Sequence, residues 1–235
     1  MTSDFDVSEL RAKHLYDGLQ ESPCSGEELM IPGPAGDIEA LTRYPEGCPE
    51  GGPVAVLCHP HPLYGGSMAN KVVHILSDTF NELGVPTVRF NFRGVGHSVG
   101  RFDRGVGETQ DLLAVLDWVR ARHPASPLWL AGFSFGAYVA LRAVERAEVQ
   151  GLLLIAPPLT IFDFGDLPEV EVPWMVVQGG KDEVISPHAV SRWVHERRNR
   201  PQYTWMAEAD HFFHGRLNRL REAIKRDWPG TVSPA

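Results

Sequence analysis

The chain has 235 residues, of which 43% are hydrophobic and 22% charged, and its formal net charge at pH 7 is −8. This composition is typical of one globular α/β domain, and no apolar run approaches the roughly twenty residues that a membrane span requires. The acidic balance argues against nucleic acid as a partner, because phosphate binding needs a basic face. We therefore expect neither a nucleic-acid nor a membrane partner, but a small molecule.

Residues 1–25 are predicted to form an N-terminal arm, and residues 26–235 a single α/β domain. The arm holds a weak helical pattern over residues 7–19, which ends before a breaker at Pro23. Its acidic start lacks the apolar segment of a signal peptide, so we expect a cytoplasmic protein. The three cysteines lack Cys-x-x-Cys spacing and imply neither a disulfide framework nor a zinc site.

The domain begins with strand candidates at residues 28–31 and 38–44, whose Pro/Gly-rich connector predicts an antiparallel hairpin. The apolar run at residues 54–58 suits a strand buried on both faces. Further strands are expected at residues 87–92, 128–131, 152–156, 174–177 and 203–206. Apolar stripes at helical spacing lie between them, over residues 72–83, 112–119, 190–194 and 217–224. This alternation predicts the α/β class, with a mostly parallel sheet of about seven to eight strands flanked by helices and a site at the strands' carboxyl ends.

The sequence Gly132-Phe133-Ser134-Phe135-Gly136 stands between a predicted strand and a predicted helix. Gly-x-Ser-x-Gly in this setting is typical of a sharp turn that exposes a nucleophilic serine, because glycine allows backbone contacts that a Cβ would block. The turn also lies at a helix N-terminus, which favours negative charge developing nearby. The alternative is a serine that only caps the helix, and a nucleophilic serine further requires a base.

Two other predicted strands end in residues that supply such a base and an acid. The segment after residues 174–177 leads to Asp182, and the segment after residues 203–206 leads to His211. In the triad that this chain order indicates, Ser134 attacks a carbonyl, His211 transfers its proton, and Asp182 orients the imidazole.

Each of these positions has alternatives. Glu183 and Asp163 are alternative acids, and the carboxylates could also be solvated loop residues. His214 is an alternative base, although it is expected in the first turn of the following helix rather than at the end of the loop.

Two more segments carry a resemblance to a known superfamily. The run Asn91-Phe92-Arg93-Gly94-Val95-Gly96-His97-Ser98 is similar to the Asp-x-Arg-Gly-x-Gly-x-Ser loop of α/β hydrolases, with Asn91 in place of the usual aspartate. The run His59-Pro60-His61-Pro62-Leu63-Tyr64-Gly65-Gly66-Ser67 stands where their oxyanion-loop His-Gly follows the third strand. Over residues 28–228 the chain resembles the α/β-hydrolase superfamily, and most of all its small bacterial serine hydrolases related to carboxylesterases and dienelactone hydrolases. It has Ser134 where the dienelactone enzymes have cysteine.

The resemblance implies the α/β-hydrolase fold, no cofactor, and an oxyanion hole formed by the backbone N–H of Phe135 and one N–H of the third-strand loop. His61 is the expected second donor, followed by Leu63 or Tyr64, because proline has no N–H. The histidine pairs 59/61 and 211/214 lack a carboxylate ligand at helical spacing, so no metal site is expected.

In this superfamily a cap after the sixth strand often sets the substrate range, and residues 157–173 are too few for a helical one. We therefore predict no large cap domain and an open cleft for short-chain acyl esters or thioesters. Five side chains could line an apolar wall of this cleft or could pack the loops: Tyr64, Phe135, Phe162, Phe164 and Phe212. Three arginines, Arg93, Arg101 and Arg104, could attract a carboxylate-bearing ester or could pair with Asp103 or Glu108.

The sequence thus predicts a carboxylesterase-like serine hydrolase that cleaves a small-molecule ester through an acyl-enzyme. An amidase, a peptidase or an acyltransferase would use the same triad. A hydrolase-fold protein that binds a ligand without turnover is a reading of a different class. The physiological substrate, the formation of a homodimer and the role of the arm stay open.

Overall fold

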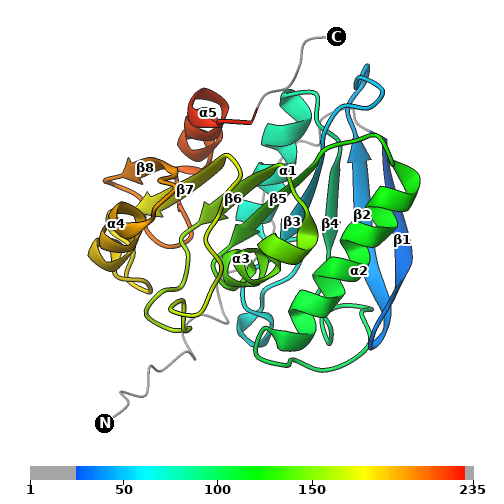
Figure 1. The fold of residues 1–235 in the computed structure, drawn as a ribbon, viewed down its shortest axis with the longest axis horizontal. Helices are drawn as coiled ribbons and strands as arrows, with labels where there is room; N and C mark the ends of the chain where they lie inside the picture. Colours follow the sequence, from blue (N-terminus) through cyan, green and yellow to red (C-terminus); the bar gives the residue numbers. More distant parts are fainter. Residues whose placement is uncertain (1–24, 231–235) are drawn as a thin grey trace.

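The computed structural model describes residues 25–230, which form an eight-stranded sheet with helices on both faces (Figure 1). The N-terminal arm predicted over residues 1–25, with its helical pattern, lies outside the described residues except for Ser25. The strand order is β1-β2-β4-β3-β5-β6-β7-β8.

The strands are β1 (Ser25–Gly33), β2 (Gly36–Tyr44), β3 (Val54–Cys58), β4 (Thr87–Phe90), β5 (Leu128–Phe133), β6 (Gly151–Ile155), β7 (Trp174–Gly179) and β8 (Gln202–Met206). The helices are α1 (Lys71–Glu82), α2 (Val106–Arg122), α3 (Phe135–Ala147), α4 (Pro187–Glu196) and α5 (Leu217–Asp227), with a short 3₁₀ turn, η2 (Pro62–Tyr64). None of the helices in the described residues is long and apolar enough to cross a bilayer.

The pairing of the strands confirms the predicted architecture. Strands β1 and β2 form the antiparallel hairpin, and β2 also pairs antiparallel with β4, whereas all pairs from β4 to β8 are parallel. Every residue of β3, β5, β6 and β7 is buried, as expected for parallel strands covered on both faces. The sequence predicted every strand, although it underestimated the length of the hairpin.

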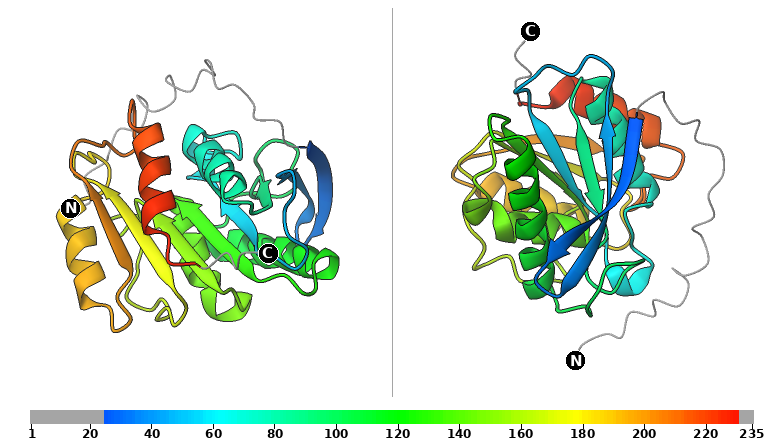
Figure 2. Two further views of the ribbon diagram at one scale, coloured as in Figure 1. Left: turned by 90° about the horizontal axis from the view of Figure 1, so that it is seen from above. Right: turned by 90° about the vertical axis from the view of Figure 1, so that its right-hand side faces the viewer.

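Two apolar cores lie on opposite faces of the sheet. One contains residues of α2, α3 and α4, and the other contains residues of α1 and α5. Figure 2 shows the sheet between these two helix layers, with the β1–β2 hairpin at one edge. The loops at the carboxyl ends of β3, β5, β7 and β8 are therefore held between two packed layers.

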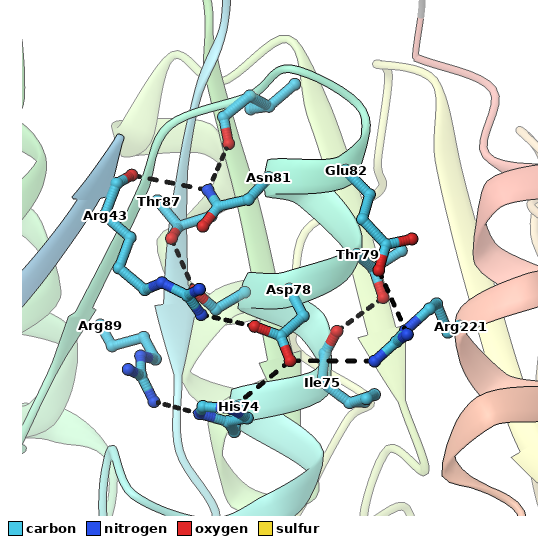
Figure 3. Close-up of polar contacts among 12 residues, drawn as sticks. Arg43, His74, Ile75, Asp78, Thr79, Asn81, Glu82, Thr87, Arg89 and Arg221 are labelled. Atoms are coloured by element: carbon cyan, nitrogen blue, oxygen red, sulfur yellow. Dashed lines mark hydrogen bonds and ion pairs between the residues drawn. The ribbon is translucent and has the colours of Figure 1, made fainter. Parts of the chain in front are cut away.

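Helix α1 is anchored by charged side chains as well as by its apolar face (Figure 3). Asp78 is buried and pairs with Arg43 of β2 at 2.5 Å, while Glu82 pairs with Arg221 of α5 at 3.2 Å. The amide of Asn81 donates to the carbonyl oxygen of Val85 at 2.9 Å. These contacts fix α1 between the hairpin and α5, and thereby the loop that connects β3 to α1.

Residues 156–173, between β6 and β7, contain neither a helix nor a strand. The prediction that no large cap domain is inserted there is therefore confirmed. This segment runs along the carboxyl edge of the sheet next to the turn after β5.

Candidate active site

Ser134 occupies the turn between β5 and α3 with φ 52° and ψ −119°, a conformation that is rare for a residue with a side chain. Its N–H donates to the carbonyl oxygen of Ile155 at 2.9 Å, which ties the turn to β6. Ser134 is the N-cap residue of α3, but its side chain makes no capping hydrogen bond. The hydroxyl is therefore not engaged in capping the helix, which was the alternative reading of the motif.

The two glycines of the motif are required by close backbone contacts. A Cβ on Gly132 would lie 2.2 Å from the carbonyl oxygen of Gly136, and a Cβ on Gly136 would lie 2.3 Å from the carbonyl oxygen of Cys58. Both distances are far below van der Waals contact. The turn can reverse this sharply, and α3 can begin this close to β3, only because neither residue has a side chain.

The structure brings Ser134, His211 and Asp182 together in one line. The Ser134 Oγ lies 3.1 Å from His211 Nε2, and His211 Nδ1 lies 2.9 Å from Asp182 Oδ2. Because a carboxylate can only accept, the Nδ1 carries the proton, and in the neutral ring Nε2 accepts from the serine hydroxyl. All three side chains are buried, so solvent does not compete strongly for these bonds.

The carboxylate of Asp182 accepts three further hydrogen bonds. Its Oδ1 accepts from the N–H groups of Val184 at 2.9 Å and Ile185 at 2.7 Å, which closes the turn after β7. Its Oδ2 also accepts from the amide Nε2 of Gln178 at 2.9 Å. The sequence analysis missed Gln178; its signal is a polar residue near the carboxyl end of a wholly buried strand.

The loops that carry Asp182 and His211 are joined through their backbones. The N–H of Gly180 donates to the carbonyl oxygen of Met206 at 2.8 Å, and the N–H of Lys181 donates to that of Ala209 at 2.9 Å. These backbone hydrogen bonds hold the Asp182 carboxylate and the His211 imidazole in fixed positions relative to each other.

The alternative acids and base lie in other positions. Glu183 accepts from the backbone N–H of His211 at 3.5 Å, not from its ring. Asp163 is exposed and accepts from the N–H of Gly165. His214 is exposed and pairs with Asp210 at 2.8 Å, so its ring faces a different carboxylate. The geometry thus favours Asp182 and His211.

His59 holds the start of the loop after β3. Its Nδ1 donates to the carbonyl oxygen of Pro60 at 2.6 Å, and its Nε2 accepts from the N–H of Phe92 at 3.0 Å. Burial lowers the pKa of His59 to about 3, so the ring is neutral at pH 7. Among residues 25–230, no group of three or more His, Cys, Asp or Glu side chains is arranged to hold a metal ion.

The same loop uses most of its N–H groups internally. The N–H of Leu63 donates to Nδ1 of His61 at 3.2 Å, and the N–H of Tyr64 donates to the carbonyl oxygen of His61 at 3.1 Å. Within the described part of the chain, the N–H groups of His61 and Phe135 have no acceptor. Burial also lowers the pKa of His61 to about 4, which keeps its Nδ1 available as an acceptor at neutral pH. Of the three candidates in this loop, only His61 has an N–H that is not already engaged.

Asn91 pairs with Glu39, a contact that no pattern in the sequence predicts. Its Nδ2 donates to Glu39 Oε2 at 2.7 Å, and its Oδ1 accepts from the N–H of Met68 at 2.8 Å. Burial alone would raise the pKa of Glu39, but hydrogen bonds from His97 and Asn91 lower it. An ionised Glu39 thus accepts from an amide where an aspartate at position 91 would place a second negative charge.

Arg93 is not free to attract a carboxylate-bearing substrate. It forms a bidentate pair with the buried Asp111 of α2: Nε donates to Oδ2 at 2.9 Å, and Nη2 donates to Oδ1 at 2.7 Å. Of the two acids that the sequence offered as partners of the arginines, Asp103 and Glu108, Glu108 instead accepts from the backbone N–H groups of Asp103 and Gly105 at the start of α2. Arg101 and Arg104 are exposed and form no ion pair among the described residues.

The five side chains expected to line an apolar wall divide into two groups. Phe135 and Phe164 are buried and pack the interior, as the alternative reading stated. Tyr64 is exposed, while Phe162 and Phe212 are half-buried, so these three rings can face a ligand.

Comparisons with known proteins find similar sequences and similar structures. The family model described as an alpha/beta hydrolase domain matches residues 55–225. The crystal structure of XC6422 from Xanthomonas campestris is described as that of an α/β serine hydrolase without lid. XC6422 is 42% identical to this chain, and the two structures align with a TM-score of 0.82 over 92% of this chain and 100% of XC6422. An alpha-beta serine hydrolase homologue from Coxiella burnetii is 45% identical, with a TM-score of 0.82 over 85% and 96%. The uncharacterized protein RP471 of Rickettsia prowazekii is 37% identical over 84% of this chain and 86% of its own length.

Proposed function

The chain belongs to the α/β-hydrolase family, and two of the structures that it resembles are described as α/β serine hydrolases or their homologues. We therefore propose that it hydrolyses carboxylic esters through an acyl-enzyme on Ser134. The observation that carries this proposal is the hydrogen-bonded line from Ser134 through His211 to Asp182. A helix-capping or merely packed serine has no need of a buried imidazole and carboxylate in this order.

The proposed reaction uses these three groups in two matched steps. His211 Nε2 takes the proton of Ser134 as the Oγ attacks the ester carbonyl, and the imidazolium then returns the proton to the leaving alcohol. Water then attacks the acyl carbonyl while His211 takes its proton, and the imidazolium returns that proton to Ser134 Oγ as the bond between Oγ and the acyl carbon breaks and the acid leaves. Asp182 fixes the ring tautomer and stabilises the imidazolium throughout.

Two backbone donors stabilise the oxyanion in this proposal. The N–H of Phe135 lies at the start of α3, and the N–H of His61 lies in the loop after β3, and neither is engaged by the described residues. Each such donor contributes about 3 kcal/mol of transition-state stabilisation. The rigid, proline-flanked loop around His61 keeps its donor in place before the substrate arrives.

The proposal extends to the size of the substrate. With no cap between β6 and β7, the site encloses little of its ligand, so we expect small acyl groups, as esters or thioesters, to be preferred to long lipid chains. A panel of p-nitrophenyl esters of increasing acyl length tests this expectation, and a kcat/KM that rises steadily beyond eight carbons contradicts it. Thioesters and amides of the best acyl group then rank the leaving groups.

A fluorophosphonate probe tests whether the site is catalytic at all. We expect the wild-type protein to be labelled, the adduct to map to Ser134 by mass spectrometry, and Ser134→Ala to be unlabelled and to lose roughly 10⁶-fold in kcat. A folded wild-type protein that the probe does not label would favour the non-catalytic binding protein instead.

A further inference from the structure

The carboxyl edge of the sheet presents different surfaces on the two sides of Ser134. On one side His211 packs against Phe133 and Phe212, with ring centroids at 5.2 and 5.0 Å, and Phe133 and Phe212 belong to the core beneath α1 and α5. On the other side His61 contacts rings of the core beneath α2, α3 and α4. The base and this second set of rings therefore lie towards opposite faces of the sheet.

The second set of rings includes an aromatic shelf, which we define as His61, Tyr64, Phe102 and Phe162. The centroid of the His61 ring lies 4.5 Å from that of Tyr64, 4.7 Å from that of Phe102 and 6.1 Å from that of Phe162. These rings come from three different loops of the carboxyl edge. Tyr64, Phe102 and Phe162 thus lie around His61, whose N–H is proposed to hold the oxyanion.

The aromatic shelf is open on one side and supported on the other. Tyr64 is 43% exposed, and Phe102 and Phe162 are half-buried. Beneath them Phe135 and Tyr138 are buried; Phe162 stacks on Tyr138 at 4.6 Å and lies 5.4 Å from Phe135. The shelf thus offers a fixed apolar surface that a ligand can cover from one side only.

The reaction geometry decides which part of an ester meets the aromatic shelf. His211 must reach the oxygen of the leaving alcohol to return the proton, so the alcohol lies on the side of His211. The acyl group then extends to the other side of the carbonyl carbon, towards His61 and Phe162. The positions of His211 and of the aromatic rings thus determine how the ester is oriented.

A one-sided surface favours a rigid, planar acyl group over a flexible one. An alkyl chain that lies on the aromatic shelf must lose rotational freedom about each bond while only one of its sides leaves water. A phenyl ring has no internal rotation to lose, and it gains edge-to-face or offset-stacked contacts with the rings beneath it. Resting on the esterase function proposed above, we propose that the preferred acyl group carries an aromatic ring, which the aromatic shelf binds.

Three p-nitrophenyl esters with a common leaving group test this proposal: the acetate, the hexanoate and the 3-phenylpropanoate. The last two have a similar reach from the carbonyl and a saturated carbon next to it, so their intrinsic reactivities are comparable. We expect the wild-type kcat/KM for the 3-phenylpropanoate to exceed that for the hexanoate by at least about fivefold. A ratio near one, or a preference for the hexanoate, overturns the proposal.

Two variants separate ring contacts from apolar area. Phe162→Leu removes a ring but keeps an apolar side chain, and we expect it to reduce the ratio of kcat/KM for the 3-phenylpropanoate to that for the hexanoate about fivefold. Ile161→Ala removes apolar surface from a neighbour that is 57% exposed, and we expect it to leave the ratio unchanged. If Phe162→Leu leaves this ratio unchanged, the proposal that the aromatic shelf binds the aromatic acyl group is wrong.

These experiments fail in a different way from the proposed function. A protein that takes the fluorophosphonate label on Ser134 and cleaves the acetate, but shows no aromatic preference, overturns only the substrate class. A protein that is neither labelled nor active on any of the three esters overturns the esterase function and the substrate class together.

Discussion

The candidate site has two halves, which are held by different forces. Strands β3 and β5 at the centre of the sheet carry the central half, and strands β7 and β8 at one edge carry the edge half. In the central half, Gly136 touches the backbone of β3 so closely that no Cβ fits. In the edge half, Asp182 accepts four hydrogen bonds, from Gln178, Val184, Ile185 and His211.

The two halves of the site should therefore tolerate different substitutions. The central half is filled with packed backbone, so an added atom should be costly there. The edge half ends in an outer strand with exposed residues, and its order depends on which donors and acceptors are present. Substitutions that add volume and substitutions that remove a hydrogen bond therefore test the halves separately.

The largest effect is expected in the edge half, for Asp182→Asn. An amide nitrogen cannot accept from the imidazole, so the ring loses the tautomer that allows Nε2 to take the serine proton, and kcat should fall by roughly 10⁴. Glu183→Gln is the matched control, because within residues 25–230 the Glu183 carboxylate accepts from the backbone N–H of His211 and not from its ring, and its kcat should stay within about threefold. Circular dichroism should show the same fold for both. Near-normal turnover of Asp182→Asn would reject Asp182 as the triad acid.

The central half should respond most to Gly136→Ala. The new Cβ would lie 2.3 Å from the carbonyl oxygen of Cys58 and 2.7 Å from that of His59, so β3 and α3 must separate. We expect a loss of at least about 2 kcal/mol in the free energy of unfolding, measured with urea. Gly165→Ala is the control: its Cβ meets only a side-chain oxygen of Asp163 at 3.2 Å, and the change should stay within about 0.5 kcal/mol. Equal effects at the two positions would contradict the packing argument.

The neutral His59 should make the central half sensitive to acid. Its pKa in the folded protein, about 3, lies below its ordinary value of 6.5. Below about pH 6.5 the unfolded chain therefore binds a proton that the folded chain does not, and the unfolding free energy falls as the pH falls.

His59→Gln removes this titration but keeps an oxygen that can accept from the N–H of Phe92. Between pH 7 and pH 5 the stability advantage of the wild type over this variant should shrink by about 2 kcal/mol in urea unfolding. Parallel pH profiles would show that His59 does not titrate in this way.

A smaller effect is expected for Gln178→Leu in the edge half. The variant removes one donor to the Asp182 carboxylate, which should lower kcat about tenfold. Its stability should change by less than about 1 kcal/mol, because Oε1 of Gln178 has no hydrogen-bond partner within residues 25–230. The two acceptors that lose Nε2, Asp182 Oδ2 and the carbonyl oxygen of Gly179, each keep another donor. Gln202→Leu, at an exposed position of β8, is the control and should alter neither quantity. Unchanged turnover of Gln178→Leu would show that the other three donors suffice.

The sequence was most informative where the site depends on neighbours in the chain. The turn around Ser134 is encoded in five consecutive residues between a strand and a helix, and Asp182 and His211 were found because each follows a strand. Their catalytic roles stay predictions until the variants above are measured. The mostly parallel pairing followed from the alternation of strand and helix patterns along the domain, whereas the strand order came from the structure.

The contacts that the sequence did not reveal join distant segments or depend on where a helix begins. Glu39 and Asn91 are 52 residues apart, and no local pattern connects them. Glu108, one of the two acids expected to pair with the arginines, falls in the first turn of α2 and caps it, which leaves the deeper Asp111 for the Arg93 guanidinium. Gln178 was overlooked because a polar residue after an apolar run resembles the start of a loop.

The Asn91–Glu39 pair limits which residues positions 39 and 91 can hold together. An aspartate at position 91, as in the loop that this segment resembles, would place two carboxylates where an amide now donates to an oxygen at 2.7 Å. Replacing Glu39 first, by a neutral residue, removes that repulsion before it arises. Residues 39 and 91 therefore form a coupled pair, and a survey of homologous sequences should find aspartate at 91 together with a residue other than glutamate at 39.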